Sequence, residues 1–321
     1  MPASDSFHWP VPAGERGGSD GRGAFVRDPY QSRQRPYPER RARLDPVVHG
    51  RGDRCPLLDR EQVGAFESDG FLGLDRVFDT SRVAAWREEA ERLRRDPDLA
   101  GRAEVITEPG SGVVRSIFRI HDISPVFSEL ARDPLLLETA RFILGGDVYI
   151  HQSRLNYKPA FKGREFYWHS DFETSHVEDG MPRMRAVSVS VTLSENSHLN
   201  GPLMLIPGSH KTYISCVGRT PDQHYKTSLK QQEYGVPDET SVAEMARAGG
   251  VMAPTGRAGS VVIFDCNTMH GSNSNITPFP RTNAFFVYNA CGNALVEPYG
   301  ERDARPEFIA GRNFTPFRSA N

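Results

Sequence analysis

FYWHSDFETSHVEDGMP, residues 166–182, is the stretch around which the rest of the chain is organised. It contains His169-Ser170-Asp171, a histidine and a carboxylate separated by one residue. On an extended or turning backbone, residues two apart point to the same side, so the imidazole and the carboxylate can bind one metal ion. This pair supplies only two ligands, and a third is therefore expected elsewhere in the chain.

The third ligand is expected among the distal histidines, which are His198, His210, His224 and His270. His270 follows the apolar run 261–264, as a ligand at the end of a strand would. His210 lies in a turn after another short apolar run and is the main rival. A second His-x-carboxylate pair, His176 and Glu178, lies within the opening stretch itself.

Arg281 favours His270 over His210. It lies eleven residues after His270 and begins the next β-type run, so we expect a hairpin to bring it back near His270. No comparable basic residue follows His210 at that spacing. A guanidinium in this place can hold a carboxylate through two parallel hydrogen bonds. The sequence therefore predicts His169, Asp171 and His270 as the metal ligands.

Two neutral imidazoles and one carboxylate on one face of an octahedral ion form the facial triad of non-haem Fe(II) oxygenases. The open positions can take the 2-oxo acid end of 2-oxoglutarate and O2. Arg281 would then bind the distal carboxylate of 2-oxoglutarate. The competing interpretations are a loop ion pair for His169 and Asp171, and a surface salt bridge for Arg281.

The composition limits the class of protein. The chain has 321 residues, of which 38% are hydrophobic and 25% charged, so a sizeable core can form in one large domain or two small ones. The 39 basic and 41 acidic residues leave a net charge of −2, which gives no argument for nucleic acid or a membrane as partner. The four cysteines form no C-x-x-C pair, and neither a secretory leader nor a membrane span is apparent, so we predict a cytoplasmic protein.

Residues 1–27 are predicted to be a disordered tail, and residues 28–321 one domain. The first 45 or so residues are rich in Pro, Gly, Ser and Arg and lack a periodic apolar pattern. Their arginines could form a nucleic-acid arm. Interleaved acidic residues favour a solvated tail instead.

Helical patterns come first along the chain, at residues 59–71, 82–95 and 133–144. In the first of them the apolar face is expected to continue to Phe71. Short β-type runs follow at residues 148–157, 186–193, 203–206, 260–264 and 283–288. Helices followed by many short strands predict a mainly β protein with flanking helices and a jelly-roll core.

The central stretch resembles the signature of the ectoine hydroxylases, members of the phytanoyl-CoA dioxygenase-like group of Fe(II)/2-oxoglutarate enzymes. The similar segments are residues 114–119, 151–154, 166–185, 200–211, 232–238 and 264–272. This resemblance extends from about residue 28 to about residue 298. It implies a double-stranded β-helix (jelly-roll, cupin-like) fold and a homodimer. It also implies hydroxylation of ectoine to 5-hydroxyectoine, a compatible solute of the stress response.

The same resemblance implies roles for individual residues, with His169, Asp171 and His270 as iron ligands. The co-substrate 2-oxoglutarate would contact Arg281, Asn156, Phe166, Ser188, Ser272 and Asn283. The substrate would face Gln152, Thr174, Phe264 and Phe285. Gln152 and Asn156 lie four apart on one predicted strand and should face the same side. Plain packing in the core or barrel interior remains open for Phe264, Phe285, Gln152, Asn156 and Ser188.

Ser175 is where the chain departs from the family motif, which has Trp after Phe-Glu-Thr. If this position forms part of the substrate wall, loss of the ring would remove about 1–2 kcal/mol of cation–π and contact energy. That is roughly a tenfold change in affinity. Two alternatives therefore stay open: a hydroxylase of another small amino-acid-like zwitterion, and a jelly-roll metal or small-molecule binding protein without catalysis.

Overall fold

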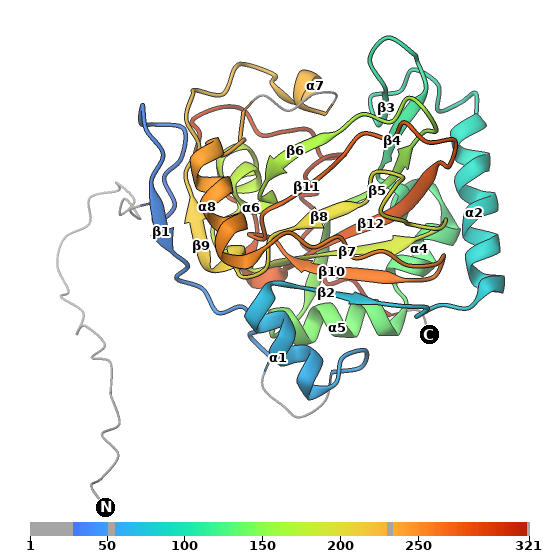
Figure 1. Cartoon of the computed structure of the whole chain (residues 1–321), viewed down its shortest axis with the longest axis horizontal. Coiled ribbons are helices and arrows are strands. Elements are labelled where there is room, and N and C mark those ends of the chain that lie inside the picture. The colour runs from blue at the N-terminus through green and yellow to red at the C-terminus, as the bar shows by residue number, and fades with distance from the viewer. Residues whose placement is uncertain (1–27, 51–54, 230–233, 320–321) are drawn as a thin grey trace, which may run out of the picture.

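The largest unit of the fold is an antiparallel sheet of seven strands in the order β2-β10-β7-β12-β5-β4-β3 (Figure 1). The computed structural model describes residues 28–50, 55–229 and 234–319, so the tail predicted over residues 1–27 lies outside the described residues. The strands of this sheet are β2 (Phe71–Leu74), β3 (Val105–Thr107), β4 (Val114–Phe118), β5 (Val148–Lys158), β7 (Ala186–Thr192), β10 (Val261–Asp265) and β12 (Arg281–Ala290).

A second antiparallel sheet has three strands in the order β6-β11-β8. They are β6 (Phe166–His169), β8 (Leu203–Leu205) and β11 (His270–Ser272), and β1 (Arg40–Ala42) pairs separately with β9 (Thr212–Ile214). Side chains from both sheets line one cavity, so the two sheets face each other across it. This arrangement agrees with the predicted jelly-roll core.

Helices flank the sheets, as predicted (Figure 1). They are α1 (Arg60–Asp69), α2 (Thr80–Arg95), α3 (Ile120–Ile123), α4 (Pro125–Ala131), α5 (Pro134–Leu144), α6 (Asp171–Thr174), α7 (Tyr225–Ser228) and α8 (Glu239–Gly249). A π-helix, η1 (Ser175–Asp179), follows α6, and two 3-10 turns are η2 (Ser209–Lys211) and η3 (Cys291–Asn293). None of the helices in the described ranges combines the length and apolar character needed to cross a bilayer.

The seven-stranded sheet has an apolar outer face and an inner face that carries both polar and apolar side chains. On β7, Val187, Val189 and Val191 belong to a large apolar cluster that also contains side chains of α2, α4 and α5. The alternating residues Ser188 and Ser190 point to the other side of the sheet, because successive side chains of a strand alternate. The main core therefore lies between the sheet and the helices. The opposite face carries polar groups beside a smaller apolar cluster that includes Val262, Phe264 and Phe285.

The end of α1 differs from the prediction. Asp59 caps this helix and forms the predicted capping box with Gln62. Gly70, with φ of 83°, ends the helix, and Phe71 pairs with Phe264 as the first residue of β2 instead of extending the helical face. A side chain at Gly70 would collide with His210, since an added Cβ would lie 2.3 Å from its ring nitrogen. Close packing thus decides where the helix stops.

Candidate active site

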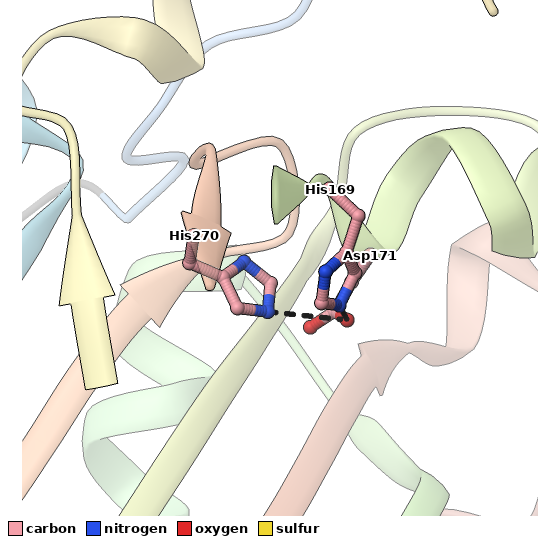
Figure 2. Close-up of side chains that lie close together, drawn as sticks. All are labelled: His169, Asp171 and His270. Atoms are coloured by element: carbon pink, nitrogen blue, oxygen red, sulfur yellow. Dashed lines mark ion pairs between the residues drawn. The ribbon is translucent and has the colours of Figure 1, made fainter. Parts of the chain in front are cut away.

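His169, Asp171 and His270 come together at the end of the three-stranded sheet (Figure 2). His169 ends β6 and pairs directly with His270 of β11, while Asp171 begins α6. Ser170 caps that helix, because its side chain accepts a hydrogen bond from the backbone N–H of Glu173. Oδ1 of Asp171 lies 3.8 Å from Nε2 of His169 and 3.7 Å from Nε2 of His270. The predicted triad is therefore brought to one point.

Neighbouring carbonyl groups orient both imidazoles. Nδ1 of His169 lies 2.7 Å from the carbonyl oxygen of Tyr167, and Nδ1 of His270 lies 2.9 Å from that of Thr268. A carbonyl oxygen can only accept, so each Nδ1 carries the proton and each Nε2 presents a lone pair. Metal-binding histidines are commonly held in this way. The three residues therefore fit a divalent metal ion.

The charge state of the triad also suits a metal. Burial, followed by the nearby His270, lowers the pKa of His169 to about 4, so its imidazole is neutral at pH 7. Burial alone would raise the pKa of Asp171, but His270 and His169 lower it below its ordinary value. Oγ of Ser188 donates to Oδ2 of Asp171 over 3.1 Å and leaves Oδ1 facing the histidines. Two imidazoles and one carboxylate form the donor set that non-haem Fe(II) sites use.

A cavity of about 500 Å³ lies on one side of the triad, between the two sheets. Its lining contains the two histidines of the triad and the predicted co-substrate residues Asn156, Phe166, Ser272 and Arg281. It also contains Phe285, which was predicted to face the substrate and is absent from the lining of the cavity on the other side of the triad. We call the first of these cavities the co-substrate cavity. Arg281 and His270 both line this cavity, but the prediction that a hairpin joins them is wrong. The chain passes from the small sheet to the large one after β11, and β12 pairs with β5 and β7.

Arg281 is a buried cation without a carboxylate partner in the described chain. Its guanidinium donates to the carbonyl of Gly201 over 2.7 Å and to Oδ1 of Asn283 over 3.3 Å, and its Nε has no partner. Burial lowers the pKa of Arg281 to about 10, so it remains charged at neutral pH. A buried unpaired charge is costly, and a bound carboxylate would offset that cost.

Lys158 adds a second basic group that the sequence analysis missed. It pairs with Arg281 across β5 and β12, and its Nζ donates to Oγ of Ser272 over 2.9 Å. Burial and Arg281 lower the pKa of Lys158 to about 6. The sequence did contain a signal for Lys158: it is an even number of residues from Gln152 and Asn156 on the same predicted strand, so all three should face the same side.

A second cavity, of about 830 Å³ and open to solvent, lies on the other side of the triad. We call it the substrate cavity. The predicted residues in its lining are Gln152, Asn156, Phe166, His169, Asp171, Thr174 and Ser175. Gln152 and Asn156 do face the same side, as predicted. Further lining residues come from β5, the π-helix and the segments around α7 and residue 305.

Arg154 is the second functional candidate that the sequence analysis missed. It lies between Gln152 and Asn156 on the inner face of β5 and lines both cavities. Its Nη1 donates to Oε1 of Gln152 over 2.8 Å, and its guanidinium carbon lies 5.2 Å from the ring centre of Phe285. No carboxylate of the described chain pairs with it within ion-pair distance, so it can receive an anionic group of a ligand.

Three predicted residues lie behind the cavities. Ser188 contacts Asp171, and Asn283 accepts from Arg281 and donates to Ser190 over 2.9 Å. Phe264 is buried in an apolar cluster and its ring centre lies 4.9 Å from that of His270. All three support residues of the site, and their assignment to ligand contact stays a prediction.

The rival histidines have other environments. Nε2 of His210 lies 3.1 Å from the carbonyl of Glu67 in α1, away from the triad. His176 lies between the carbonyl of Met181, at 2.7 Å, and Oδ1 of Asp28, at 2.9 Å. Its ring also stacks on Tyr299 with 4.0 Å between centres. Within the described ranges, these two histidines are packing residues.

Known proteins share both the sequence and the fold. The family model of phytanoyl-CoA dioxygenase (PhyH) matches residues 66–283. Ectoine dioxygenase of Sphingopyxis alaskensis is 58% identical over 287 residues, which cover 89% of this chain and 94% of that protein. Ectoine dioxygenase of Streptomyces coelicolor is 48% identical over 288 residues, covering 88% and 96%.

Solved structures of ectoine dioxygenase (EctD) are similar to this chain in fold as well as in sequence. The crystal structure of EctD from S. alaskensis with bound Fe matches with a TM-score of 0.82 and 52% identity, covering 91% of this chain and 98% of that one. The structure of EctD from S. alaskensis with 2-oxoglutarate and 5-hydroxyectoine has a TM-score of 0.81 and 54% identity, covering 89% and 95%. The chain therefore belongs to the phytanoyl-CoA dioxygenase (PhyH) family and, within it, to the ectoine dioxygenases.

Proposed function

We propose that this protein hydroxylates ectoine to 5-hydroxyectoine, with Fe(II) as metal and with 2-oxoglutarate and O2 as co-substrates. The observation that carries the proposal is the triad of His169, Asp171 and His270 between two cavities of different chemistry. The co-substrate cavity holds the charged Arg281 and the amine of Lys158, which a bound carboxylate would favour in its ammonium form. The similarity to ectoine dioxygenases over most of the chain supports ectoine as the substrate.

Each part of the site has a role in this proposal. His169, Asp171 and His270 hold Fe(II), which when bound supplies the oxidising chemistry by coupling decarboxylation of 2-oxoglutarate to hydroxylation. Arg281 and Lys158 bind the distal carboxylate, with Ser272 and Asn156 beside them. Arg154 receives the carboxylate of the substrate in the second cavity. Phe166 lines both cavities, as do Arg154, Asn156 and His169.

Turnover with defined components tests this function. The protein is incubated with ectoine, Fe(II), 2-oxoglutarate and O2, and mass analysis reports one added oxygen together with release of succinate. His169→Ala should lose iron binding and turnover together, because two ligands do not retain the ion. His198→Ala, at an exposed histidine, is the matched control. Succinate release that does not respond to ectoine would exclude ectoine as the substrate.

The assignment of Arg281 has its own test. Arg281→Ala should raise the 2-oxoglutarate concentration needed for half-maximal turnover by about tenfold to a hundredfold, as loss of a charge-assisted hydrogen bond does. Affinity for ectoine should change little, because Arg281 lies in the other cavity. An unchanged 2-oxoglutarate requirement would contradict the assignment.

We also propose a cytoplasmic homodimer in which residues 28–321 form one dioxygenase domain. The four cysteines are free thiols, which supports a reducing compartment. The seven-stranded sheet and helices α1 to α5 share one large apolar cluster, which supports a single domain. Sedimentation velocity with the full chain tests the dimer, and a purely monomeric species would exclude it.

A further inference from the structure

His151 interrupts the regular alternation of β5. Gln152 pairs with Val287 and Ile150 pairs with Tyr288, so His151 is an extra residue without a partner on β12. Such a β-bulge redirects a side chain. In a regular strand His151 and Gln152 would point to opposite faces, yet here both line the substrate cavity.

The imidazole of His151 is buried and only partly satisfied. Only 3% of the surface of His151 is exposed. Nε2 lies 3.4 Å from Oγ of Ser175 and 3.5 Å from Oδ2 of Asp179, both on the π-helix. Nδ1 has no hydrogen-bond partner within the described residues. The ring thus has one engaged nitrogen and one buried nitrogen without a partner, and His151 lines both the substrate cavity and the neighbouring cavity that contains His121.

Asp179 determines which nitrogen carries the proton. Arg305 donates to it through Nε over 2.7 Å and through Nη2 over 2.6 Å. Burial opposes ionisation, but Arg305 and His151 hold the pKa of Asp179 at about 2, so it is a carboxylate at neutral pH. A carboxylate beside Nε2 favours the proton on that nitrogen and leaves Nδ1 as an acceptor. An unpaired buried acceptor gains from a donor supplied by a ligand.

The other predicted acceptor of this cavity is already engaged. Nε2 of Gln152 donates to the carbonyl of Ile309 over 2.7 Å, and its Oε1 accepts from Arg154. Arg154 supplies a positive charge to the same cavity. A small zwitterion with a carboxylate toward Arg154 also needs acceptors for its cationic N–H groups. Glu178 lies in the same lining but is paired with Arg33 over 2.6 Å, and His151 with Ser175 provides further acceptors.

We propose that His151, together with the hydroxyl of Ser175, is a specificity-determining contact that accepts hydrogen bonds from the cationic ring of the substrate. This inference rests on the proposed function and deepens it. The chemical class it selects is a small cyclic amidinium with a carboxylate, of which ectoine is an example. Asp179 and Arg305 act behind His151 as positioning residues.

The test measures ectoine binding without turnover. Calorimetry under anaerobic conditions, with the protein loaded with Fe(II) and 2-oxoglutarate, gives the dissociation constant of ectoine. His151→Phe keeps a ring of similar size without an acceptor, and should weaken ectoine binding about tenfold or more. His151→Gln returns an amide oxygen and should recover most of the affinity. The dissociation constant of 2-oxoglutarate should stay within about twofold, which a general loss of structure would not allow.

Two further variants make the result specific. His121→Phe is the matched control, because His121 lies on the neighbouring segment and contacts Ser153 outside the substrate cavity. Ser175→Ala removes only a hydroxyl and should weaken ectoine binding about threefold, so it tests the proposal even if His151→Phe folds poorly. Unchanged ectoine affinity in both His151→Phe and Ser175→Ala would overturn the inference and leave the proposed function intact. A wild-type protein that neither binds nor converts ectoine would overturn both.

Discussion

Ser175 is the residue at which this chain differs from the motif of its family, and it lies in the wall of the substrate cavity. Its position is four residues after Asp171, the proposed metal ligand, at the start of the π-helix. A hydroxyl here contacts the imidazole of His151. Where the motif has Trp, this chain has a hydroxyl beside an imidazole, which we propose to act as hydrogen-bond acceptors.

Ser175→Trp should restore the aromatic face and raise ectoine affinity about tenfold, because a cation–π contact contributes about 1–2 kcal/mol. The measurement is ectoine binding and turnover at several ectoine concentrations. In the Ser175→Trp background, His151→Phe should cost less than in the wild type, since the two contacts replace each other. Ser175→Trp without any gain would show that this position does not limit ectoine use.

Lys158 makes 2-oxoglutarate binding depend on pH. Its pKa of about 6 reflects burial and then Arg281 and Arg115, opposed by Glu108 and Glu165. A bound carboxylate favours the ammonium form, so binding takes up a proton above about pH 6. Affinity should therefore rise as the pH falls from about 9 to about 7, by at most about tenfold per pH unit for one proton.

Calorimetry in two buffers of different ionisation enthalpy measures this proton uptake directly. Lys158→Met should abolish this proton uptake, whereas Lys211→Met, at an exposed lysine, should not.

Lys158 also affects folding stability. Without ligand, the unfolded chain holds more protons at Lys158 between its folded pKa of about 6 and the ordinary value of 10.5. This group alone therefore makes the folded state less stable as the pH falls through that window.

Arginines near both ends of the described chain hold α6, which begins with Asp171, and the π-helix, which begins with Ser175. Arg33 donates to Glu173 over 2.7 Å and to Glu178 over 2.6 Å, and Arg305 pairs with Asp179. The ion pair of Arg33 with Glu173 is buried, with 2% and 1% of the side chains exposed. π-Helices are rare and frequent at functional sites. These pairs fix the register of α6 and the π-helix and thereby the wall of the substrate cavity.

Arg33→Ala should destabilise the protein by about 3–5 kcal/mol, because it leaves Glu173 buried without its partner. Urea unfolding measures the loss, and the affinity for Fe(II) should fall in the same variant, since α6 carries Asp171. Arg35→Ala is the matched control: its ion pair with Glu39 is partly exposed, at 46% and 24%, and should contribute no more than about 1 kcal/mol. Equal effects of the two substitutions would contradict the proposed role of the buried pair.

Local chemistry predicted those elements whose signals lie within a few residues. Asp59, Asp133 and Gly145 mark helix ends in the sequence and do so in the structure. The strands β6 and β11 were missed because each has only three or four residues and is stabilised by pairing with distant chain. The π-helix was missed because no residue pattern distinguishes it from a loop; buried ion pairs to remote arginines hold it.

Some residues of the site were predicted from the sequence and others were missed. The meeting of His169, Asp171 and His270 was predicted from ligand chemistry, strand ends and the position of Arg281. The hairpin expected to bring Arg281 back is absent, and Arg281 reaches the site from β12 of the large sheet instead. Arg154 and Lys158 were missed because an inward-facing cation on a strand looks like an ordinary surface residue until its cross-strand partner is known. The bulge at His151 depends on strand register, which the sequence alone does not specify.

At the scale of the whole molecule, the seven-stranded sheet separates the apolar core from the two cavities. Leu137 of α5 is fully buried on the outer side, in the cluster that includes Val189 and Phe286. Arg154 and Asn283 extend from the same strands to the inner side. Stability therefore depends mainly on one face of the sheet and ligand binding on the other.

Leu137→Ala should lower the free energy of unfolding by about 2–5 kcal/mol, as for other buried leucines. The dissociation constants of 2-oxoglutarate and ectoine should stay within about twofold, because no cavity residue touches this position on the outer face. Chemical unfolding and calorimetry measure the two quantities on one sample. Leu135→Ala, at a partly buried leucine of the same helix, should cost less. A large loss of ligand affinity in Leu137→Ala would show that the two faces are coupled.

The alternation along β5, β7 and β12 has a consequence for how such an enzyme diversifies. Inward positions such as Ser190 and Gln152 can vary with little effect on the outer packing, so new substrates become accessible at nearly constant melting temperature. Outward positions such as Val189 and Phe286 can vary to adapt the protein to heat while its chemistry stays the same. A gene library that varies only the inward-facing positions would yield variants with different substrate selectivity. A library that varies only the outward-facing positions would yield variants with different thermal stability.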